Sequence, residues 1–145
     1  MLVEGSGMDL NAIPLFAMLK GKLSHTSQRQ RLIAENVANA DVPNYAPRDL
    51  KAFSFDQQLK SAQATQSVGV ARTSGAHLDL DTPSASAAGD SVKAPDSEIR
   101  LDGNHVVLEE QMVKMSEARM DYDAVVGFYQ QSLSLLKMAA QKPGG

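Results

Sequence analysis

The C-terminal part of the chain reads LEEQMVKMSEARMDYDAVVGFYQQSLSLLKMAA (residues 108–140), and this stretch decides the fold. Apolar residues recur in it at alternating steps of four and three, and nine of the ten positions in this repeat are apolar. The repeat consists of Leu108, Met112, Met115, Arg119, Tyr122, Val126, Tyr129, Leu133, Leu136 and Ala140. A mean step of 3.5 residues keeps one side of a helix, its seam, facing a partner helix over the whole length. The stretch therefore predicts a helix about 50 Å long.

A second repeat with the same steps lies near the N-terminus, and seven of its nine positions are apolar. This seam consists of Ala12, Phe16, Leu19, Leu23, Thr26, Gln30, Ile33, Val37 and Ala40. We predict a mainly α fold in which the terminal helices, residues 9–40 and 105–141, pair as a coiled-coil-like hairpin. Two matched helices at opposite ends of a short chain favour a building block over an enzyme.

Residues 41–104 separate the predicted helices. The sequence Val42-Pro43-Asn44-Tyr45 predicts a turn with Asn44 in the left-handed conformation, which Asn accepts better than other non-Gly residues. Residues 50–59 predict a short helix or an irregular packed segment. Residues 61–97 are rich in small residues, which predicts a flexible segment, and short strands are compatible with 68–72 and 98–101. Asn104 is the predicted N-cap of the C-terminal helix.

The apolar face of each helix widens toward the chain termini. The widening residues are Val125, Phe128, Leu135 and Met138 in the C-terminal helix, and Ile13, Leu15 and Met18 in the N-terminal helix. One partner helix covers only a narrow stripe, so a wider face needs a second neighbour. We expect Val125, Phe128 and Leu135 to form lateral contacts between subunits. Arg119 interrupts its seam, where it either fixes the register by pairing with an acidic neighbour or extends to solvent.

Composition excludes several classes of function. The net charge of −3 is spread without a basic stripe, which argues against a nucleic-acid partner. No stretch approaches the 18 apolar residues of a membrane span, and the N-terminus lacks the features of a secretory signal peptide. The chain has no Cys. From composition alone we expect a cytoplasmic protein.

No pattern of residues predicts catalysis, a cofactor or a metal site. His25, His77 and His105 are not at ligand spacing, and Asp79-Leu80-Asp81 lacks the Gly and Glu of a calcium-binding loop. Glu109 and Glu110 lie in the first turn of the last helix, where carboxylates complement the helix dipole. We therefore expect a protein that is not an enzyme.

Residues 36–45, Asn-Val-Ala-Asn-Ala-Asp-Val-Pro-Asn-Tyr, resemble a motif of bacterial flagellar axial proteins. The family pattern is approximately Asn-Ile-Ala-Asn-Ala-x-Thr-Pro-Gly-Tyr. Within that group, the short length and Arg48-Asp49-Leu50 after the turn resemble the basal-body rod proteins, those of the proximal rod above all. Two positions depart from the pattern, because Val42 replaces Thr and Asn44 replaces Gly. The resemblance marks Asn36, Asn39, Pro43, Asn44 and Tyr45 as the expected assembly motif.

The resemblance implies a structural subunit that packs helically with copies of itself and other rod subunits. The rod crosses the periplasm and transmits torque, its subunits leave through the flagellar type III export apparatus without a cleaved signal peptide, and its base contacts the proteins of the MS ring. This implied location in the basal body replaces the cytoplasmic expectation. The alternatives are another axial protein of the family and a cytoplasmic coiled-coil adaptor.

Overall fold

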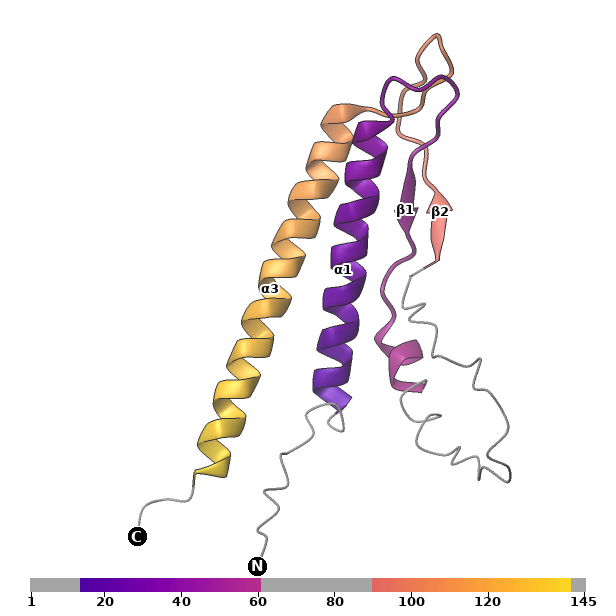
Figure 1. Cartoon of the computed structure of the whole chain (residues 1–145). Coiled ribbons are helices and arrows are strands. Elements are labelled where there is room, and N and C mark those ends of the chain that lie inside the picture. The colour runs from indigo at the N-terminus through magenta and orange to yellow at the C-terminus, as the bar shows by residue number, and fades with distance from the viewer. Residues whose placement is uncertain (1–13, 61–89, 142–145) are drawn as a thin grey trace, which may run out of the picture.

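The structure is a computed structural model that describes residues 14–60 and 90–141. Its elements are α1 (Pro14–Ala38), β1 (Arg48–Leu50), β2 (Ser91–Lys93) and α3 (Leu108–Ala140), and residues 55–60 are also helical. They lie side by side in the order α3, α1 and the strand pair, so the molecule is elongated and α1 is covered from two directions (Figure 1). Neither long helix has a stretch apolar enough for a membrane span.

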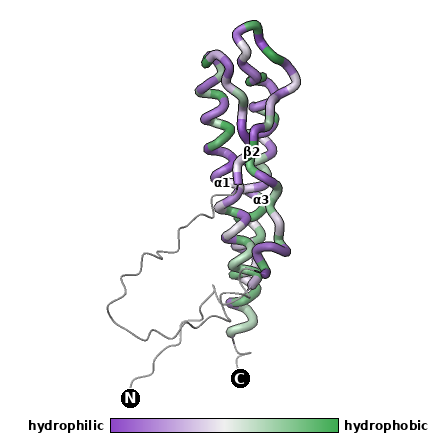
Figure 2. The backbone as a smooth tube through the Cα atoms, turned by 90° about the vertical axis from the view of Figure 1, so that its right-hand side faces the viewer, coloured by the Kyte–Doolittle hydropathy of each residue, from purple (hydrophilic) through white to green (hydrophobic). Residues whose placement is uncertain are grey.

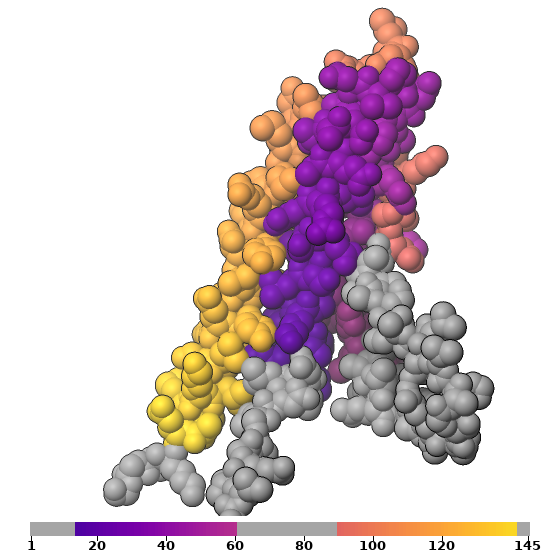
Figure 3. Space-filling view, viewed as in Figure 1, coloured from indigo at the N-terminus to yellow at the C-terminus, as the bar shows by residue number. Residues whose placement is uncertain are grey.

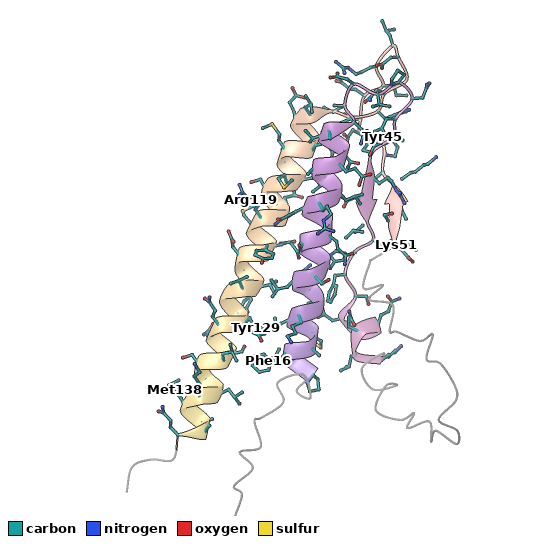
Figure 4. All side chains as sticks on the ribbon, in the orientation of Figure 1. Phe16, Tyr45, Lys51, Arg119, Tyr129 and Met138 are labelled. Atoms are coloured by element: carbon teal, nitrogen blue, oxygen red, sulfur yellow. The ribbon has the colours of Figure 1, made fainter. Side chains whose placement is uncertain are left out.

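The two long helices form an antiparallel hairpin. Near the start of α1, the Phe16 ring packs edge-on against Tyr129, with 5.4 Å between ring centroids (Figure 4). Further along α1, Gln30 donates a hydrogen bond of 3.3 Å to the carbonyl of Ala118, which lies in the first half of α3. Residue numbers therefore rise along α1 in the direction in which they fall along α3, so the two helices are antiparallel. The predicted mainly α fold with paired terminal helices is confirmed.

The seam of α3 is rotated relative to the predicted one. Met115, Tyr129 and Leu136 of the predicted seam are half-buried, at the interface with α1 or its edge. At three other positions of the predicted repeat, the residue one place earlier in the sequence takes the buried position. The buried residues of α3 are Gln111, Ala118 and Val125, each directly before a predicted seam position. The predictions for Leu108, Met112 and Tyr122 are wrong, because all three are exposed; Met112 is 70% exposed. Val126 and Leu133 are only half-buried.

The rotation has a physical cause at the start of α3. Gln111 is fully buried there because its amide accepts a hydrogen bond from Asn36 and donates to Asp96. A satisfied buried amide loses little on leaving water, so it can displace the more apolar Met112 from the interface. Arg119 follows Ala118 and is exposed, and it forms no ion pair with another described residue (Figure 4).

The seam of α1 follows the prediction more closely. Phe16, Thr26 and Ile33 are buried, and Leu19 and Leu23 are half-buried. The prediction for Val37 is wrong, since this residue is exposed and the preceding Asn36 takes the buried place. Thr26 is accommodated because its hydroxyl donates to the carbonyl of Lys22, one turn earlier.

The strand pair lies along the side of α1 away from α3. β1 and β2 are antiparallel, with Arg48 opposite Lys93 and Leu50 opposite Ser91. Arg29 of α1 holds β1 through two hydrogen bonds to the Asp49 carboxylate, at 3.0 and 3.1 Å. The hydrogen bonds that Arg29 donates to Asp49 raise the pKa of the guanidinium, so Arg29 stays charged.

The segment after β1 approaches α1 closely at Gly21. A Cβ atom at this position would lie 2.9 Å from the Gln58 side chain and 3.4 Å from the Phe53 ring. The nearer of these atoms ends a flexible side chain that can move aside, so a small side chain at this position would displace Gln58 more than the segment itself. The predicted strand at 98–101 is wrong, because a turn between Arg100 and Gly103 occupies this stretch. The predicted strand at 68–72 and most of the predicted flexible segment lie outside the described residues.

Candidate functional site

The predicted turn after α1 forms as expected. The Tyr45 N–H bonds to the Val42 carbonyl at 3.3 Å, and Asn44 is left-handed, with φ of 58°. The Asn44 N–H also bonds to the carbonyl of Asp102 at 3.1 Å. This bond joins the turn to a second loop, in which Gly103 has φ of 79° and leaves no room for a Cβ atom against Asn44. The motif is therefore one half of a two-loop structure that closes the hairpin.

Asn36, the first residue of the motif, is buried and makes hydrogen bonds to four other groups of the chain. Its amide N donates to the Arg48 carbonyl at 2.8 Å and to Gln111 Oε1 at 3.0 Å. Its amide O accepts from the Tyr45 hydroxyl at 3.1 Å and from the Arg48 N–H at 3.0 Å. These four bonds use its full capacity. Asn36 thus ties α1, the turn, β1 and α3 of one chain together, and has no hydrogen-bonding group left for a neighbouring subunit.

Asp96 continues this network beneath the start of α3. Its side chain has no exposed surface, and it accepts hydrogen bonds from Lys114 at 2.7 Å, Gln111 at 2.8 Å and the Val107 N–H at 2.8 Å. Burial is the largest single influence and raises the pKa of Asp96, but the hydrogen bonds together outweigh burial and lower the pKa below its usual value. A carboxylate from another segment therefore holds the N-terminus of α3, where the helix dipole favours negative charge.

Asn104 joins the two loops, and the prediction that it caps α3 is wrong. Its amide N donates to the carbonyls of Asn39 at 3.0 Å and Val42 at 2.7 Å, while its amide O accepts from the Val106 N–H at 2.8 Å. Because Asn104 is occupied in this way, α3 begins only at Leu108, with Val107 as the capping position. Asn39 in turn donates to the Glu35 carbonyl and is half-buried.

Sequence reasoning missed three network residues on the later segments, Asp96, Gln111 and Lys114, and it gave Asn104 a different role. The available signal was the spacing of seven between Gln111, Ala118 and Val125, which marks one line on a helix. That line is less apolar than the seam we predicted. This line of α3 is buried because Gln111 has hydrogen-bonding partners in Asn36 and Asp96.

The outer surface at this end, which we call the closed tip, comprises residues 35–45 and 97–110. Pro43 and Asn44 are exposed there. Five large apolar side chains are exposed as well, namely Val37, Val42, Ile99, Leu101 and Leu108. A groove of about 390 Å³ lies beside them, with an apolar floor that includes Ala40 and Val106. The remaining lining residues are Val37, Asp41, Glu98, Arg100, Val107, Leu108 and Glu109.

The opposite end, which we call the open end, comprises residues 14–24 and 126–141. The hydropathy of α3 rises toward this end (Figure 2), and side chains of its last turns stand clear of α1 (Figure 3). Phe128 is 60% exposed and Leu135 is 55% exposed, and both lie on one flank of α3 at a spacing of seven. The lateral prediction for Val125 is wrong, because this residue is 7% exposed and packs inside the hairpin.

The described residues offer surfaces for assembly and little for chemistry. They contain no group of three or more side chains suited to hold a metal ion. His25 bonds through Nε2 to the Lys51 carbonyl at 2.7 Å and packs against Phe53, which gives it a structural role. Burial raises the pKa of Tyr45, so its hydroxyl stays protonated and keeps donating to Asn36.

Comparison with known proteins points to one family. The flagellar basal body rod protein FlgB of Agrobacterium fabrum is 34% identical over 115 residues, which are 79% of this chain and 83% of that protein. FlgB of Aeromonas hydrophila is 31% identical over 84% of this chain and 89% of its own length, and FlgB of Bacillus subtilis is 29% identical over 74% and 78%. No family model matches the chain. With a helical hairpin, a loop motif and this similarity along most of its length, the chain belongs to the FlgB family of flagellar basal-body rod proteins.

Proposed function

We propose that this chain is a non-enzymatic subunit of the proximal rod that packs side by side with neighbouring subunits through the flank of α3 carrying Phe128 and Leu135. The observation that carries this proposal is the exposure of these two large side chains, seven residues apart, on one line of α3. Because each side chain is still more than half exposed, its full burial would gain about 1–2 kcal/mol, and a ring of subunits repeats that gain at every contact.

The buried network supports a rod subunit that transmits torque across the periplasm. A torque-bearing subunit has to keep its shape under load, and polar contacts with fixed geometry resist sliding of one helix on another better than apolar contacts do. The network around Asn36, Gln111 and Asp96 joins four segments of the chain at the closed end. The motif thus acts in assembly indirectly, because it holds the shape that the subunit presents.

We further propose the remaining associations that the family resemblance implies. The subunit leaves the cell through the flagellar export apparatus without a cleaved signal peptide and takes its place near the rod base and the MS ring. Mass spectrometry of the protein from purified basal bodies tests the export route. If the mature protein lacks about the first 15–30 residues of the sequence, as it would after cleavage of a signal peptide, the proposed export route is wrong.

Leu135→Asp tests the lateral contact. The substitution places a charge in the proposed interface, so we expect rod formation and motility to be lost while expression and solubility stay normal. Met112→Asp is the matched control, since Met112 is also exposed but lies about 140° around α3 from Leu135. Normal swimming of Leu135→Asp cells would refute the lateral contact.

Cell fractionation tests the location itself. The proposal requires the wild-type protein in purified basal bodies. Its absence there, with the protein retained in the cytoplasm, would instead favour the coiled-coil adaptor.

A further inference from the structure

The second loop of the closed tip contains the dipeptide Asp102-Gly103, and the fold uses both residues (Figure 1). Gly103 has φ of 79°, and a Cβ atom at this position would collide with the side chain of Asn44. Asp102 Oδ1 accepts a hydrogen bond from the Asn104 N–H at 3.0 Å, which fixes the path of the chain after the turn. The loop is therefore built on Asp followed by Gly.

Asp followed by Gly is also the pair of residues most prone to a spontaneous reaction of the backbone. The amide N of the Gly attacks the side-chain carboxyl carbon of the Asp, and Gly leaves this approach open because it has no side chain. A C–N bond forms, and the amide proton leaves with the carboxyl hydroxyl as water. Water then opens the resulting succinimide. Opening at the side-chain carbonyl restores Asp, whereas opening at the main-chain carbonyl gives isoaspartate, in which the backbone is one methylene longer.

In the folded chain, the peptide group that joins Asp102 to Gly103 is hydrogen-bonded on both sides. Its carbonyl accepts from the Asn44 N–H at 3.1 Å, and its N–H donates to the Arg100 carbonyl at 2.9 Å. The Asp102 carboxylate is bonded to the Asn104 N–H as well. Ring closure has to turn this peptide group relative to the side chain, so it requires these bonds to break. The reaction is therefore slow in a closed tip and fast in an open one.

We propose that Asp102 is a site of isoaspartate formation whose reactivity is controlled by closure of the tip. Chains with a closed tip keep Asp102 intact, whereas unfolded chains convert it. In a converted chain, the carbonyl that accepts from Asn44 becomes a free carboxylate on a side branch, and the longer backbone displaces Gly103 from its place against Asn44. Such a chain cannot rebuild the tip, so the modification marks chains that stay unfolded. The inference concerns a single chain and is independent of the proposed rod role.

Peptide mapping of the purified full chain tests the site. The protein is incubated near pH 6 in native buffer and, in parallel, in guanidinium chloride that unfolds it. Trypsin then releases residues 101–114, and isoaspartate is recognised by a shifted chromatographic retention at unchanged mass and by fragmentation that places it at residue 102. We expect isoaspartate to form at least about tenfold faster in the unfolded chain. Equal rates would overturn the protection by folding, and an unmodified peptide from the unfolded chain would overturn the site.

Asp102→Glu is the matched control for the unfolded chain. It keeps the carboxylate and Gly103, but its longer side chain would have to close a six-membered ring, which forms far more slowly than the five-membered succinimide. We expect the modification to disappear from residues 101–114, while the nearby pair Asp96-Ser97 isomerises at its wild-type rate. Deamidation of Asn104 is distinguished by its change in mass. A shifted peptide of unchanged mass in this variant would assign the signal to another residue and overturn the proposal.

Asn104→Ala tests the role of the closed tip in native buffer. The Asn104 amide donates to the carbonyls of Asn39 and Val42 at 3.0 and 2.7 Å and so joins the two loops. Its removal should raise the rate of isoaspartate formation at residue 102 at least about fivefold, because the tip opens more often. An unchanged rate would show that closure of the tip does not protect Asp102.

Two further variants keep this test specific. Asn44→Val strains the facing turn without removing a bond of Asn104, so it should raise the rate in the same direction even if Asn104→Ala fails to fold. Asp90→Ala breaks an exposed pair with Lys51 outside the tip and should leave the rate at its wild-type value. A rise of the same size in Asp90→Ala would contradict a role of the tip.

Limited proteolysis tests the consequence of the modification. Chains aged in guanidinium chloride are returned to native buffer and treated briefly with trypsin, and the peptide released early is compared with the peptide from chains that stayed intact. We expect isoaspartate at residue 102 to be at least about threefold enriched in the early peptide, because chains with an open tip are cleaved first. Equal content in the two fractions would show that converted chains still close the tip.

Discussion

The interior of the closed end and the open end of the hairpin are built on different physical principles. At the closed end, buried amides and a carboxylate meet in a network in which every described buried side-chain polar atom has a partner. At the open end, the contact between Phe16 and Tyr129 is apolar, and neighbouring apolar side chains remain exposed. Hydrogen bonds demand fixed geometry, whereas apolar contacts tolerate many partners. The polar network therefore specifies the fold at one end, whereas the other end leaves apolar surface exposed, where we propose that subunits meet.

Removal of the buried carboxylate should produce the largest loss of stability. Asp96→Ala leaves the Lys114 ammonium, the Gln111 amide and the Val107 N–H without their acceptor, so we expect a loss of about 3 kcal/mol or more in the free energy of unfolding. Urea denaturation followed by circular dichroism measures it. The control is Asp90→Ala, which breaks an exposed pair with Lys51 and should cost less than about 1 kcal/mol. If both substitutions lower the free energy of unfolding by the same amount, the buried network does not stabilise the closed end more than an exposed ion pair does.

Truncation at the apolar contact should have the next largest effect. Phe16→Ala removes a buried ring that packs on Tyr129, and we expect a loss of about 2–4 kcal/mol because the helix ends can relax into part of the space. The matched variant is Leu15→Ala at the neighbouring exposed position, for which the loss should stay below about 1 kcal/mol. A larger loss for Leu15→Ala than for Phe16→Ala would reverse the assignment of the α1 seam.

Acid should weaken the closed end through Asp96. Its pKa is lower in the folded chain than in the unfolded chain, so its stabilisation is present above about pH 4 and is lost as pH falls through the folded pKa. The stability difference between wild type and Asp96→Asn should therefore shrink between pH 7 and pH 3. Denaturation curves of both proteins at the two pH values measure this change. A difference that stays constant would mean that the charge of Asp96 contributes nothing.

The smallest effect concerns the turn. Asn44→Gly should leave stability within about 0.5 kcal/mol, because Gly adopts the left-handed conformation without strain. Asn44→Val should cost about 1–2 kcal/mol, since a β-branched residue resists positive φ. Thermal unfolding of the two variants in parallel is the measurement. Identical melting temperatures of the two variants would show that the left-handed turn does not stabilise the closed end.

The helices and the turn could be predicted because their causes are local. A repeat of 3.5 residues defines a helix face wherever the chain lies, and Pro43 followed by Asn44 favours one turn type through its own backbone preferences. The closing network could not be predicted in the same way. Asn36, Asp96 and Gln111 are separated by up to 75 positions, and no residue near any of them reveals the other two.

The prediction of lateral contacts between subunits shows the same difference between features with local causes and features that depend on distant segments. Phe128, Leu135 and Val125 are all apolar and lie beside the predicted seam, so the sequence treats them alike. In the structure Val125 is inside the hairpin, while the other two are outside. A rotation of α3 by less than one residue position is enough to exchange their environments, because successive residues point 100° apart.

The sequence by itself determined that this protein has two long helices joined into a hairpin, with a left-handed turn after the first. Those features depend on periodicity and on the conformational preferences of single residues. Only the tertiary structure decided which line of α3 faces α1 and which apolar residues remain exposed. The reason is that a polar side chain such as Gln111 is buried only when partners from distant segments replace its hydrogen bonds to water, and those partners meet only in the folded chain.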